Sequence, residues 1–249
     1  MRYGICHLSI VPVRFEPSDR SEMVSQLLYG EHFKILEHRK KWSKIRISFD
    51  RYEGWVDNEQ FKAIDKNEHK ALEKDDPIYS SDLIEFVSDS NEHLYPIPIG
   101  SSLSGLPILK HKHDGHVIFG EQPKSKLVET ALLYLNSPYL WGGKTPFGLD
   151  CSGFTQMVYK INGYSLFRDA SQQAAQGEVL SFIEETEPGD LAFFDNKDGE
   201  IIHVGIILKD NHIIHAHGKV RIDRLDQSGI HNTGLRRHTH KLRVIKKII

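Results

Sequence analysis

The chain has 249 residues, of which 39% are hydrophobic, so it is long enough to bury at least one substantial core. Its formal net charge of -2, with both signs interspersed along the chain, argues against a dedicated nucleic-acid binder. No stretch of the sequence approaches the apolar length that a bilayer span requires, so we expect no membrane partner.

Two cysteines, Cys6 and Cys151, are too few for a disulfide framework or a four-cysteine zinc site. Cys6 lies among strand-like residues and is expected to be a buried, inert thiol. The first residues lack the charged region, apolar core and small-residue cleavage site of a secretory signal. The sequence therefore favours a chain that is made and kept in the cytoplasm.

Residues 1–62 are predicted to form a small β-barrel of short strands separated by turns. The strands are expected at Ile5–Val13, Phe33–Glu37, Trp42–Ile47 and Gly54–Asp57. The charged segment Gln60–Asp76 is predicted to be a connector with a helical turn.

Residues 63–122 are rich in proline, glycine, serine and histidine and are predicted to be a linker and a second, degenerate β module. Its apolar runs are Leu94–Ile99 and His116–Phe119. Three histidines surround Asp114 and raise the question of a metal site: His111, His113 and His116. No second cluster at a recognised ligand spacing accompanies them, so we expect surface histidines and neither a metal nor a cofactor.

Residues 123–249 begin with helical patterns and end with strands, which predicts an α+β domain with segregated layers. Helices are expected at Ser125–Asn136, at the segment that starts near Cys151, and at Ala170–Gly177, with the glycine-rich loop Ser137–Leu149 after the first. The predicted strands are Leu191–Phe194, Ile201–Leu208, Ile213–His217, Val220–Leu225 and Leu242–Ile249. The basic stretch Arg236–His240 is expected to be a solvated turn.

Cys151 follows Asp150 and falls in the first turn of its helix, where free backbone N–H groups and the positive end of the helix dipole stabilise a thiolate. The glycines before it allow a substrate to approach the backbone closely. A buried structural cysteine fits this local context equally well, so a nucleophile requires a base elsewhere in the chain.

The segment Lys209-Asp210-Asn211 is predicted to be a tight hairpin loop. A three-residue loop pairs Leu208 with His212 and Gly205 with His215, whereas a two-residue loop would place the two candidate histidines on opposite faces.

In that register His203 and His215 are diagonal neighbours on one face, and Gly205 leaves room for a ring. His203 would take the proton of Cys151 as a general base, and His215 would orient His203. His217 competes with His215 for the orienting role because it lies directly opposite His203.

Several motifs occur in a fixed order over residues 125–220: Tyr139-Leu-Trp-Gly-Gly, Asp150-Cys-Ser-Gly-Phe-Thr, Pro188-Gly-Asp-Leu-Ala-Phe-Phe, His203-Val-Gly-Ile and Ile214-His-Ala. The set resembles the NlpC-type bacterial cell-wall peptidases. The resemblance implies a papain-like α+β domain, here residues 123–249, and a Cys-His-His triad at Cys151, His203 and His215.

The first barrel resembles the bacterial SH3-like modules of one branch of that family, most closely in Tyr52-Glu-Gly-Trp-Val. The implied fold is a papain-like domain preceded by one or two small SH3-like β-barrels. That branch is similar to γ-D-glutamyl-L-diamino acid endopeptidases, which act on murein peptides with a free N-terminal L-alanine. The resemblance assigns the alanine–glutamate end of the substrate to Tyr52, Tyr139, Asp150, Ser152 and Ser171.

An acidic residue of the first barrel is expected to bind the substrate ammonium, with Glu22 as the first choice and Glu53 as the second. Asp150 is a further candidate for that carboxylate, and Trp141 is expected only to pack. The backbone N–H of Cys151 would hold the oxyanion.

The expected activity is therefore cysteine endopeptidase cleavage of murein tripeptides or tetrapeptides in cell-wall peptide recycling. Both meso-diaminopimelate and L-lysine remain open for the third position. An amidase or acyltransferase could use the same Cys-His pair and would differ in the acceptor. A cell-wall binding protein with an inactive peptidase domain is disfavoured because Cys151, His203 and His215 are all present.

Overall fold

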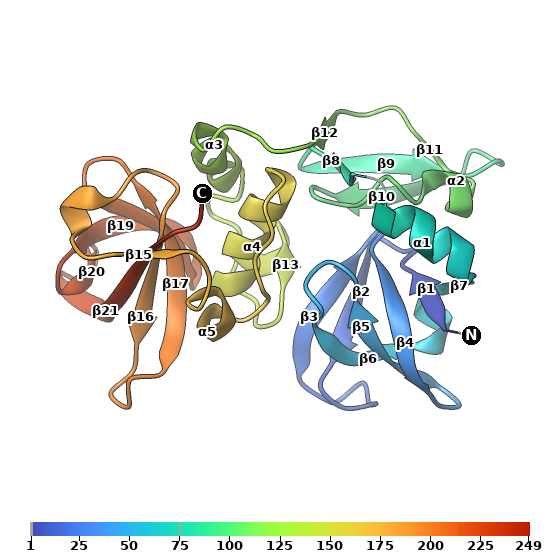
Figure 1. Ribbon diagram of the computed structural model, residues 1–249, viewed down its shortest axis with the longest axis horizontal. Helices are drawn as coiled ribbons and strands as arrows, with labels where there is room; N and C mark the ends of the chain where they lie inside the picture. Colours follow the sequence, from blue (N-terminus) through green and yellow to red (C-terminus); the bar gives the residue numbers. More distant parts are fainter. Residues whose placement is uncertain (1, 75) are drawn as a thin grey trace.

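The computed structural model describes residues 2–74 and 76–249. Met1 and Asp75 lie outside the described residues, and Asp75 falls within the predicted connector Gln60–Asp76. An N-terminal barrel and a C-terminal sheet lie at opposite ends of the molecule, with helices α3, α4 and α5 between them (Figure 1). None of the described helices is long and apolar enough to cross a membrane.

The barrel is one seven-stranded sheet in the order β3-β2-β6-β5-β4-β1-β7. Its elements are β1 Tyr3–Ile5, β2 Ile10–Arg14, β3 Met23–Leu28, β4 His32–His38, β5 Trp42–Ile47, β6 Glu53–Asp57, the short 3-10 helix Asn58–Gln60 and β7 Lys62–Ile64. The predicted single strand Ile5–Val13 is wrong. The chain turns between β1, which pairs with β4 and β7, and β2, which pairs with β3 and β6.

Strand β3 was missed because its sequence does not alternate between apolar and polar residues. Its last four residues are all buried, including Ser25 and Gln26, since the C-terminal domain covers the face that would otherwise meet water.

The predicted connector Gln60–Asp76 holds more structure than expected, namely β7 and the nine-residue helix α1, Lys66–Lys74. The following module has a three-stranded sheet, β10-β9-β11, and a two-stranded sheet, β12-β8. Its elements are β8 Ile78–Ser80, β9 Ile84–Ser88, β10 Leu94–Pro98, α2 Leu106–Leu109, β11 Lys112–His113 and β12 Val117–Phe119.

The module's histidines are engaged separately. His116 Nδ1 lies 2.9 Å from Asp82 Oδ1, and His111 Nδ1 lies 3.0 Å from the Tyr29 hydroxyl. These two contacts point the rings to different partners rather than to one shared point.

The C-terminal domain places three helices against one antiparallel sheet in the order β15-β21-β16-β17-β18-β19-β20, with β20 also paired to β21. Its elements are α3 Ser125–Leu133, β13 Lys144–Thr145, β14 Gly148–Leu149, α4 Cys151–Ile161, α5 Ala170–Gln173, β15 Glu178–Leu180, the 3-10 helix Ile183–Glu185, β16 Leu191–Asp195, β17 Ile201–Leu208, β18 His212–His217, β19 Lys219–Asp226, β20 Gly229–Asn232 and β21 Arg237–Lys247.

Several element boundaries differ from the sequence prediction. Helix α5 ends at Gln173 rather than at Gly177. Helix α3 stops at Leu133 because Asn136 adopts a left-handed backbone with φ of 71°, which a right-handed helix cannot contain. The basic stretch Arg236–His240 is not a solvated turn, since β21 begins at Arg237 and pairs with β20.

The face of the sheet that meets α4 is apolar. Val204, Ile206 and Ile214 are buried in the same cluster as Phe154 and Met157 of the helix. This packing fixes the start of α4 against β17, because a well-packed core leaves little freedom for a helix to slide.

The barrel docks onto the C-terminal domain through a buried ion cluster. Glu31 of the barrel accepts from Lys144 Nζ at 3.2 Å and from Lys160 Nζ at 2.5 Å, and all three side chains are at most 4% exposed. Burial alone would raise the pKa of Glu31, but the two ammonium groups outweigh it and lower that pKa to about 2. The carboxylate is therefore the counter-ion that makes both lysines tolerable in the interface.

We expect Glu31→Gln to lower the free energy of unfolding by about 3–5 kcal/mol at pH 7, because it leaves two buried ammonium groups without a counter-ion. Urea denaturation followed by tryptophan fluorescence measures the change. Glu53→Gln is the matched control on the same barrel: its partners Lys44 and Arg46 are partly exposed, so its cost should stay within about 1 kcal/mol. Equal losses for the two variants would contradict the assignment of Glu31 as the essential counter-ion.

Candidate active site

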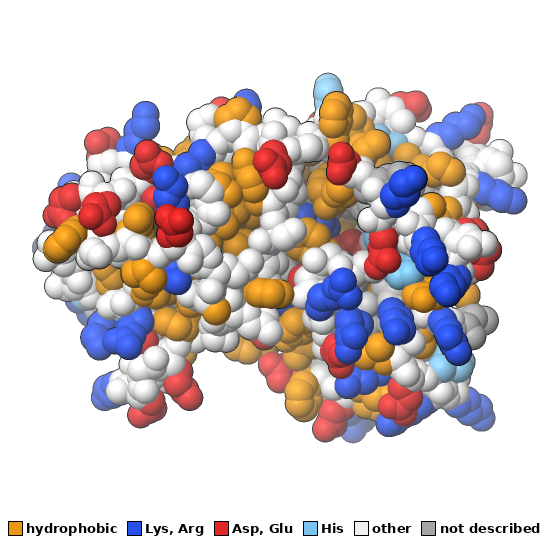
Figure 2. All heavy atoms as spheres, in the orientation of Figure 1, with side chains coloured by type: hydrophobic (Ala, Val, Ile, Leu, Met, Phe, Trp, Pro, Cys, Tyr) orange, Lys and Arg blue, Asp and Glu red, His pale blue; other side chains and the backbone are white. Residues whose placement is uncertain are grey.

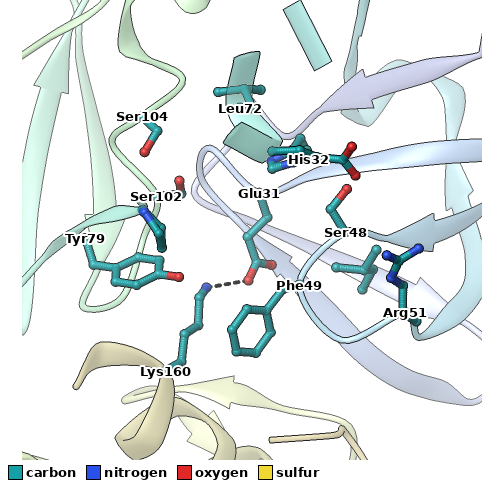
Figure 3. Close-up of a pocket in the computed structure, with 13 residues that line it drawn as sticks. Glu31, His32, Ser48, Phe49, Arg51, Leu72, Tyr79, Ser102, Ser104 and Lys160 are labelled. Atoms are coloured by element: carbon teal, nitrogen blue, oxygen red, sulfur yellow. Dashed lines mark hydrogen bonds and ion pairs between the residues drawn. The ribbon is translucent and has the colours of Figure 1, made fainter. Parts of the chain in front are cut away.

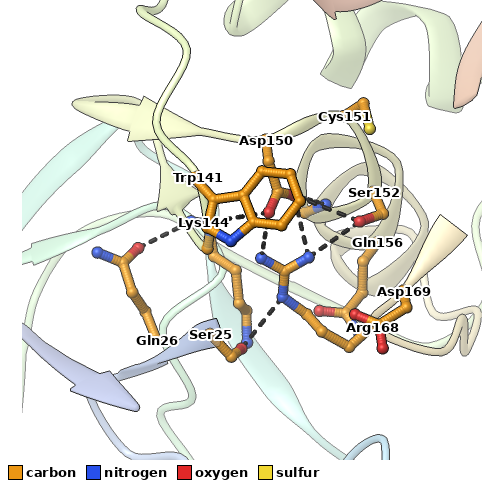
Figure 4. Close-up of polar contacts among 12 residues, drawn as sticks. Ser25, Gln26, Trp141, Lys144, Asp150, Cys151, Ser152, Gln156, Arg168 and Asp169 are labelled. Atoms are coloured by element: carbon orange, nitrogen blue, oxygen red, sulfur yellow. Dashed lines mark hydrogen bonds and ion pairs between the residues drawn. The ribbon is translucent and has the colours of Figure 1, made fainter. Parts of the chain in front are cut away.

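Helix α4 begins at Cys151, as predicted, because Asp150 caps it. The Asp150 backbone is extended and its Oδ1 accepts the Gly153 N–H at 2.7 Å. Its Oδ2 accepts the Gly142 N–H at 2.9 Å, which ties the glycine-rich loop to the helix. One carboxylate thus fixes both the loop and the residue that carries the thiol (Figure 4).

Arg168 completes this arrangement. Its guanidinium is 1% exposed and donates to both Asp150 oxygens, at 3.0 and 2.7 Å. It also donates to Ser152 Oγ at 3.0 Å and to Ser25 Oγ of the barrel at 3.2 Å. The network therefore joins the helix start, the loop and the barrel in one buried cluster.

The thiol of Cys151 is 8% exposed. Burial raises its pKa to about 12 and the Asp150 carboxylate adds to the rise, whereas backbone N–H groups of Val204 and Ser152 lower it. Because Val204 follows His203 in β17, the thiol lies against the part of the strand that carries this histidine. The resting thiol is protonated at neutral pH and needs a base to become a nucleophile.

The hairpin has the predicted register, with Leu208 opposite His212 and left-handed backbone at Asp210 and Asn211. A side chain at Gly205 would lie 2.9 Å from His215 Cβ, so glycine is required for that ring to sit opposite it. Both histidines consequently occupy one face of the sheet.

His203 Nε2 lies 2.8 Å from His215 Nδ1, and both rings are buried. His215 Nε2 in turn lies 3.1 Å from Asp223 Oδ2, and Arg221 Nη2 donates to Asp223 Oδ1 at 3.0 Å. His217 contacts His203 only at 6.4 Å between ring centroids, so His215 is the residue placed to orient His203.

Burial lowers the pKa of His203 well below its ordinary value, and His215, His240 and His217 lower it further. Burial also lowers the pKa of His215, although the Asp223 carboxylate opposes that shift. Both rings are therefore neutral at pH 7, the state in which an imidazole can accept a proton from a thiol.

Sequence reasoning missed two residues of this cluster. His240 of β21 stacks on His203 with ring centroids 4.2 Å apart, and only the long-range pairing of β21 brings it there. Asp223 had a local signal: it is a charged residue in phase with the buried Leu225 of β19, where an inward-facing carboxylate requires a partner.

A cavity of about 560 Å³ lies between the barrel and the C-terminal domain beside Cys151. The space-filling view shows an indentation at the lower edge between these two parts (Figure 2). The predicted substrate-binding residues all line the cavity: Glu22, Tyr52, Tyr139, Asp150, Ser152 and Ser171. His203 and His215 are not in the lining, and both are buried.

The interpretation of Trp141 as a packing residue is wrong. Its side chain is 61% exposed, lines the cavity and donates from Nε1 to Glu22 Oε1 at 2.5 Å. Glu53, the alternative to Glu22, is instead paired with Arg46 at 2.6 Å on the barrel surface and does not line this cavity. Asp169 also lines the cavity and was missed.

Burial raises the pKa of Tyr52, and the nearby Asp169 carboxylate raises it further.

The two cysteines remain free thiols, and Cys6 is fully buried as expected, with burial raising its pKa to about 12.

Two segments of the chain match known protein families. Residues 136–241 match the NlpC/P60 family, and residues 13–61 match the bacterial dipeptidyl-peptidase Sh3 domain. The chain is 29% identical over 226 residues to a γ-D-glutamyl-L-lysine dipeptidyl-peptidase of Bacillus subtilis, covering 77% of this chain and 71% of the relative. It is 27% identical to dipeptidyl-peptidase 6 of Lysinibacillus sphaericus, covering 85% of this chain and 88% of the relative.

Among solved structures, an NlpC/P60 family protein from Bacillus cereus shares the fold with a TM-score of 0.81 at 16% identity, over 99% of both chains. An NlpC/P60 endopeptidase from Photobacterium damselae superposes with a TM-score of 0.69 over 97% of this chain and 70% of that one, at 15% identity. The predicted fold class is confirmed. The boundaries at residues 62 and 122, and the second SH3-like module, stay predictions.

We expect Asp223→Asn to lower kcat by about 10²-fold, less than the roughly 10⁴-fold cost of disabling a group that orients a base directly. Because the carboxylate raises the pKa of His215, its loss should also move the acid limb of the kcat/KM profile to lower pH. The control is Asp226→Asn, a substitution on β19 like Asp223→Asn, which removes only a partly exposed ion pair with His238 of β21. A reduced kcat with an unmoved acid limb would mean that Asp223 is only structural.

Buried histidines should make the fold acid-sensitive. Burial, followed by His215 and His217, lowers the pKa of His240 to about 4. Between about pH 6.5 and pH 4 the unfolded chain therefore binds more protons than the folded one, and the free energy of unfolding should fall as pH falls.

Urea denaturation at pH 7 and pH 5 tests this expectation: His240→Gln should lose less stability between the two values than the unsubstituted protein. His93→Gln, at a ring that is 70% exposed, reports what the loss of a surface imidazole does by itself. An unchanged difference in His240→Gln would contradict the assignment of His240 as one of the groups responsible.

Proposed function

The chain carries an NlpC/P60 cysteine-peptidase domain behind a bacterial SH3 domain, and from this premise we propose that it hydrolyses the γ-D-glutamyl–L-diamino acid bond of murein peptides with a free N-terminal L-alanine. The observation that carries the proposal is the shared cavity, in which barrel residues Glu22 and Tyr52 face the same space as Cys151. The names of the related dipeptidyl-peptidases support the same bond.

In the proposed reaction Cys151 transfers its proton to His203, and the thiolate attacks the γ-carbonyl carbon of D-glutamate. The C–N bond then breaks, the leaving amine takes the proton from the imidazolium, and a thioester remains on Cys151. Water, deprotonated by His203, hydrolyses the thioester and regenerates the thiol. Free N–H groups at the start of α4 stabilise the oxyanion in both halves.

The hydrogen-bonded row His203–His215–Asp223 suits proton transfer between Cys151 and His203. Burial disfavours a lone thiolate on Cys151 and a lone imidazolium on His203. Proton transfer from the thiol to the imidazole creates both charges together, and each charge stabilises the other. Asp223 then stabilises the positive charge that spreads through the hydrogen-bonded pair.

Glu22 is the carboxylate that we assign to the substrate ammonium. The Asp150 oxygens already accept from Arg168, Gly142 and Gly153, so an incoming ammonium would have to displace buried partners. Glu22 instead has one bond, from the exposed Trp141, at the cavity wall. A peptide whose amine is capped would leave this carboxylate unpaired and would bind poorly.

Selection for a free amine implies a substrate that another hydrolase has already released from the sugar strand. We therefore propose a role in recycling released murein tripeptides and tetrapeptides, and the cytoplasm as its place.

The test is cleavage of L-Ala-γ-D-Glu-L-Lys, of the meso-diaminopimelate analogue, and of their N-acetylated forms. We expect release of the free diamino acid from the free-amine peptides only, and no release with Cys151→Ala. Glu22→Gln should lower kcat/KM for the free-amine peptide by about tenfold to a hundredfold, the cost of about 1.4–2.7 kcal/mol of binding, whereas Glu53→Gln should leave it unchanged.

Three outcomes would change the proposal in different ways. Equal cleavage of acetylated and free peptides would overturn the amine selection and leave the peptidase intact. Formation of a new amide in place of the free diamino acid would identify a transferase. No turnover of any of these peptides would overturn the assigned bond.

A further inference from the structure

A second cavity, of about 430 Å³, lies on the other side of the buried ion cluster and does not include the active-site residues. Its walls come from the barrel, helix α1, the second β module and α4 (Figure 3). Glu31 and Lys160 lie together on one wall in this view, and His32 lies beside Leu72 on another. The cavity is therefore a place where four parts of the chain meet.

Three potential metal ligands converge beside this cavity, and two of them, His32 and Glu73, line it. His69 and Glu73 are four residues apart on α1 and project from one face of that helix, while His32 is the first residue of β4. One ligand atom from each lies within 4.8 Å of the other two. Over residues 2–74 and 76–249 these are the only His, Cys, Asp or Glu side chains that meet in such a group of three.

The spacing fits a small tetrahedral ion. Ligand atoms about 2.0–2.1 Å from a tetrahedral zinc lie roughly 3.4 Å from one another. His69 Nε2 and Glu73 Oε1 are separated by 3.4 Å, and no backbone movement is needed for this pair. The His32 ligand atom has to approach the other two by about 1.4 Å at most, a shift that a side-chain rotation supplies.

The two rings have hydrogen-bonding capacity that the described residues do not use. His69 is 5% exposed and stacks on Tyr3 at 4.1 Å, which fixes its ring plane. The Nε2 of His32 is buried without a hydrogen-bond partner in the described part of the chain. The Nδ1 of His69 also has none among the described residues, but the ring nitrogen that faces Glu73 is Nε2, so only the unpartnered His32 atom belongs to the group. Buried polar atoms in this state are uncommon and call for a physical explanation.

We propose that His32, His69 and Glu73 bind one divalent transition-metal ion of the zinc class, with the remaining coordination position facing the cavity. Two imidazoles and a carboxylate form a ligand set that zinc favours and that calcium and magnesium, which require oxygen, do not. The ion would join α1 to the barrel and so brace the connector that carries the second β module. This proposal is independent of the peptide-cleaving function.

The experiment uses full-length Cys151→Ala protein, because the Cys151 thiol beside His203 is itself able to bind zinc. After treatment with a chelator, Zn²⁺ is titrated by calorimetry and Co²⁺ by its visible absorption bands. We expect one ion per chain, Co²⁺ bands typical of nitrogen and oxygen ligands, and a melting temperature about 5 °C higher at a hundredfold excess over Kd.

Glu73→Gln and His32→Gln, each in the Cys151→Ala background, should weaken binding at least about tenfold. Glu59→Gln and His116→Gln are the controls, because both side chains are exposed and lie outside the group. Glu73 is about half exposed, so its substitution keeps the test valid even where His32→Gln fails to fold.

The proposal is overturned if neither ion binds, or if Glu73→Gln and His32→Gln bind as tightly as the controls. It is equally overturned if His203→Gln, rather than these variants, removes the bound ion. In that case the metal occupies the active-site histidines only.

Discussion

The structure of the active site depends on the buried pairing of Asp150 with Arg168. The carboxylate ends the loop that contains Trp141, caps α4 and so sets the position of Cys151, while the guanidinium reaches Ser25 of the barrel. A charged pair this deeply buried is costly unless every donor and acceptor is used, and here both oxygens accept more than one bond. The same interaction that sets the position of Cys151 therefore also aligns the barrel that completes the cavity.

Because Arg168 bonds both Asp150 and Ser25 of the barrel, the barrel is part of the active-site cavity. A side chain at Gly142 would come within 2.2 Å of the Met23 carbonyl, so the loop and the barrel strand touch backbone to backbone. Glu31, Lys144 and Lys160 then close the interface with three buried charges. Interdomain contacts of this kind fix Glu22 and Tyr52 relative to Cys151 and leave the cavity little freedom to change shape.

Much of the site followed from local sequence. The helix start at Cys151 was predictable because capping is decided within a few residues, and the hairpin register followed from a three-residue loop and side-chain alternation. Both signals act over short distances along the chain. The prediction of a single strand at Ile5–Val13 was wrong for the opposite reason. The segment divides into β1 and β2 because each pairs with strands that lie further along the sequence.

By itself the sequence determined the order of the elements, the helix that presents the thiol and the face shared by His203 and His215, because local capping and periodicity encode them. Only the tertiary structure decided which distant side chains complete the site. It placed Glu22 and Trp141 in the cavity wall, left Glu53 on the barrel surface and stacked His240 on His203. Those contacts join strands and loops far apart in the chain, and their pairing arises from packing that no local pattern records.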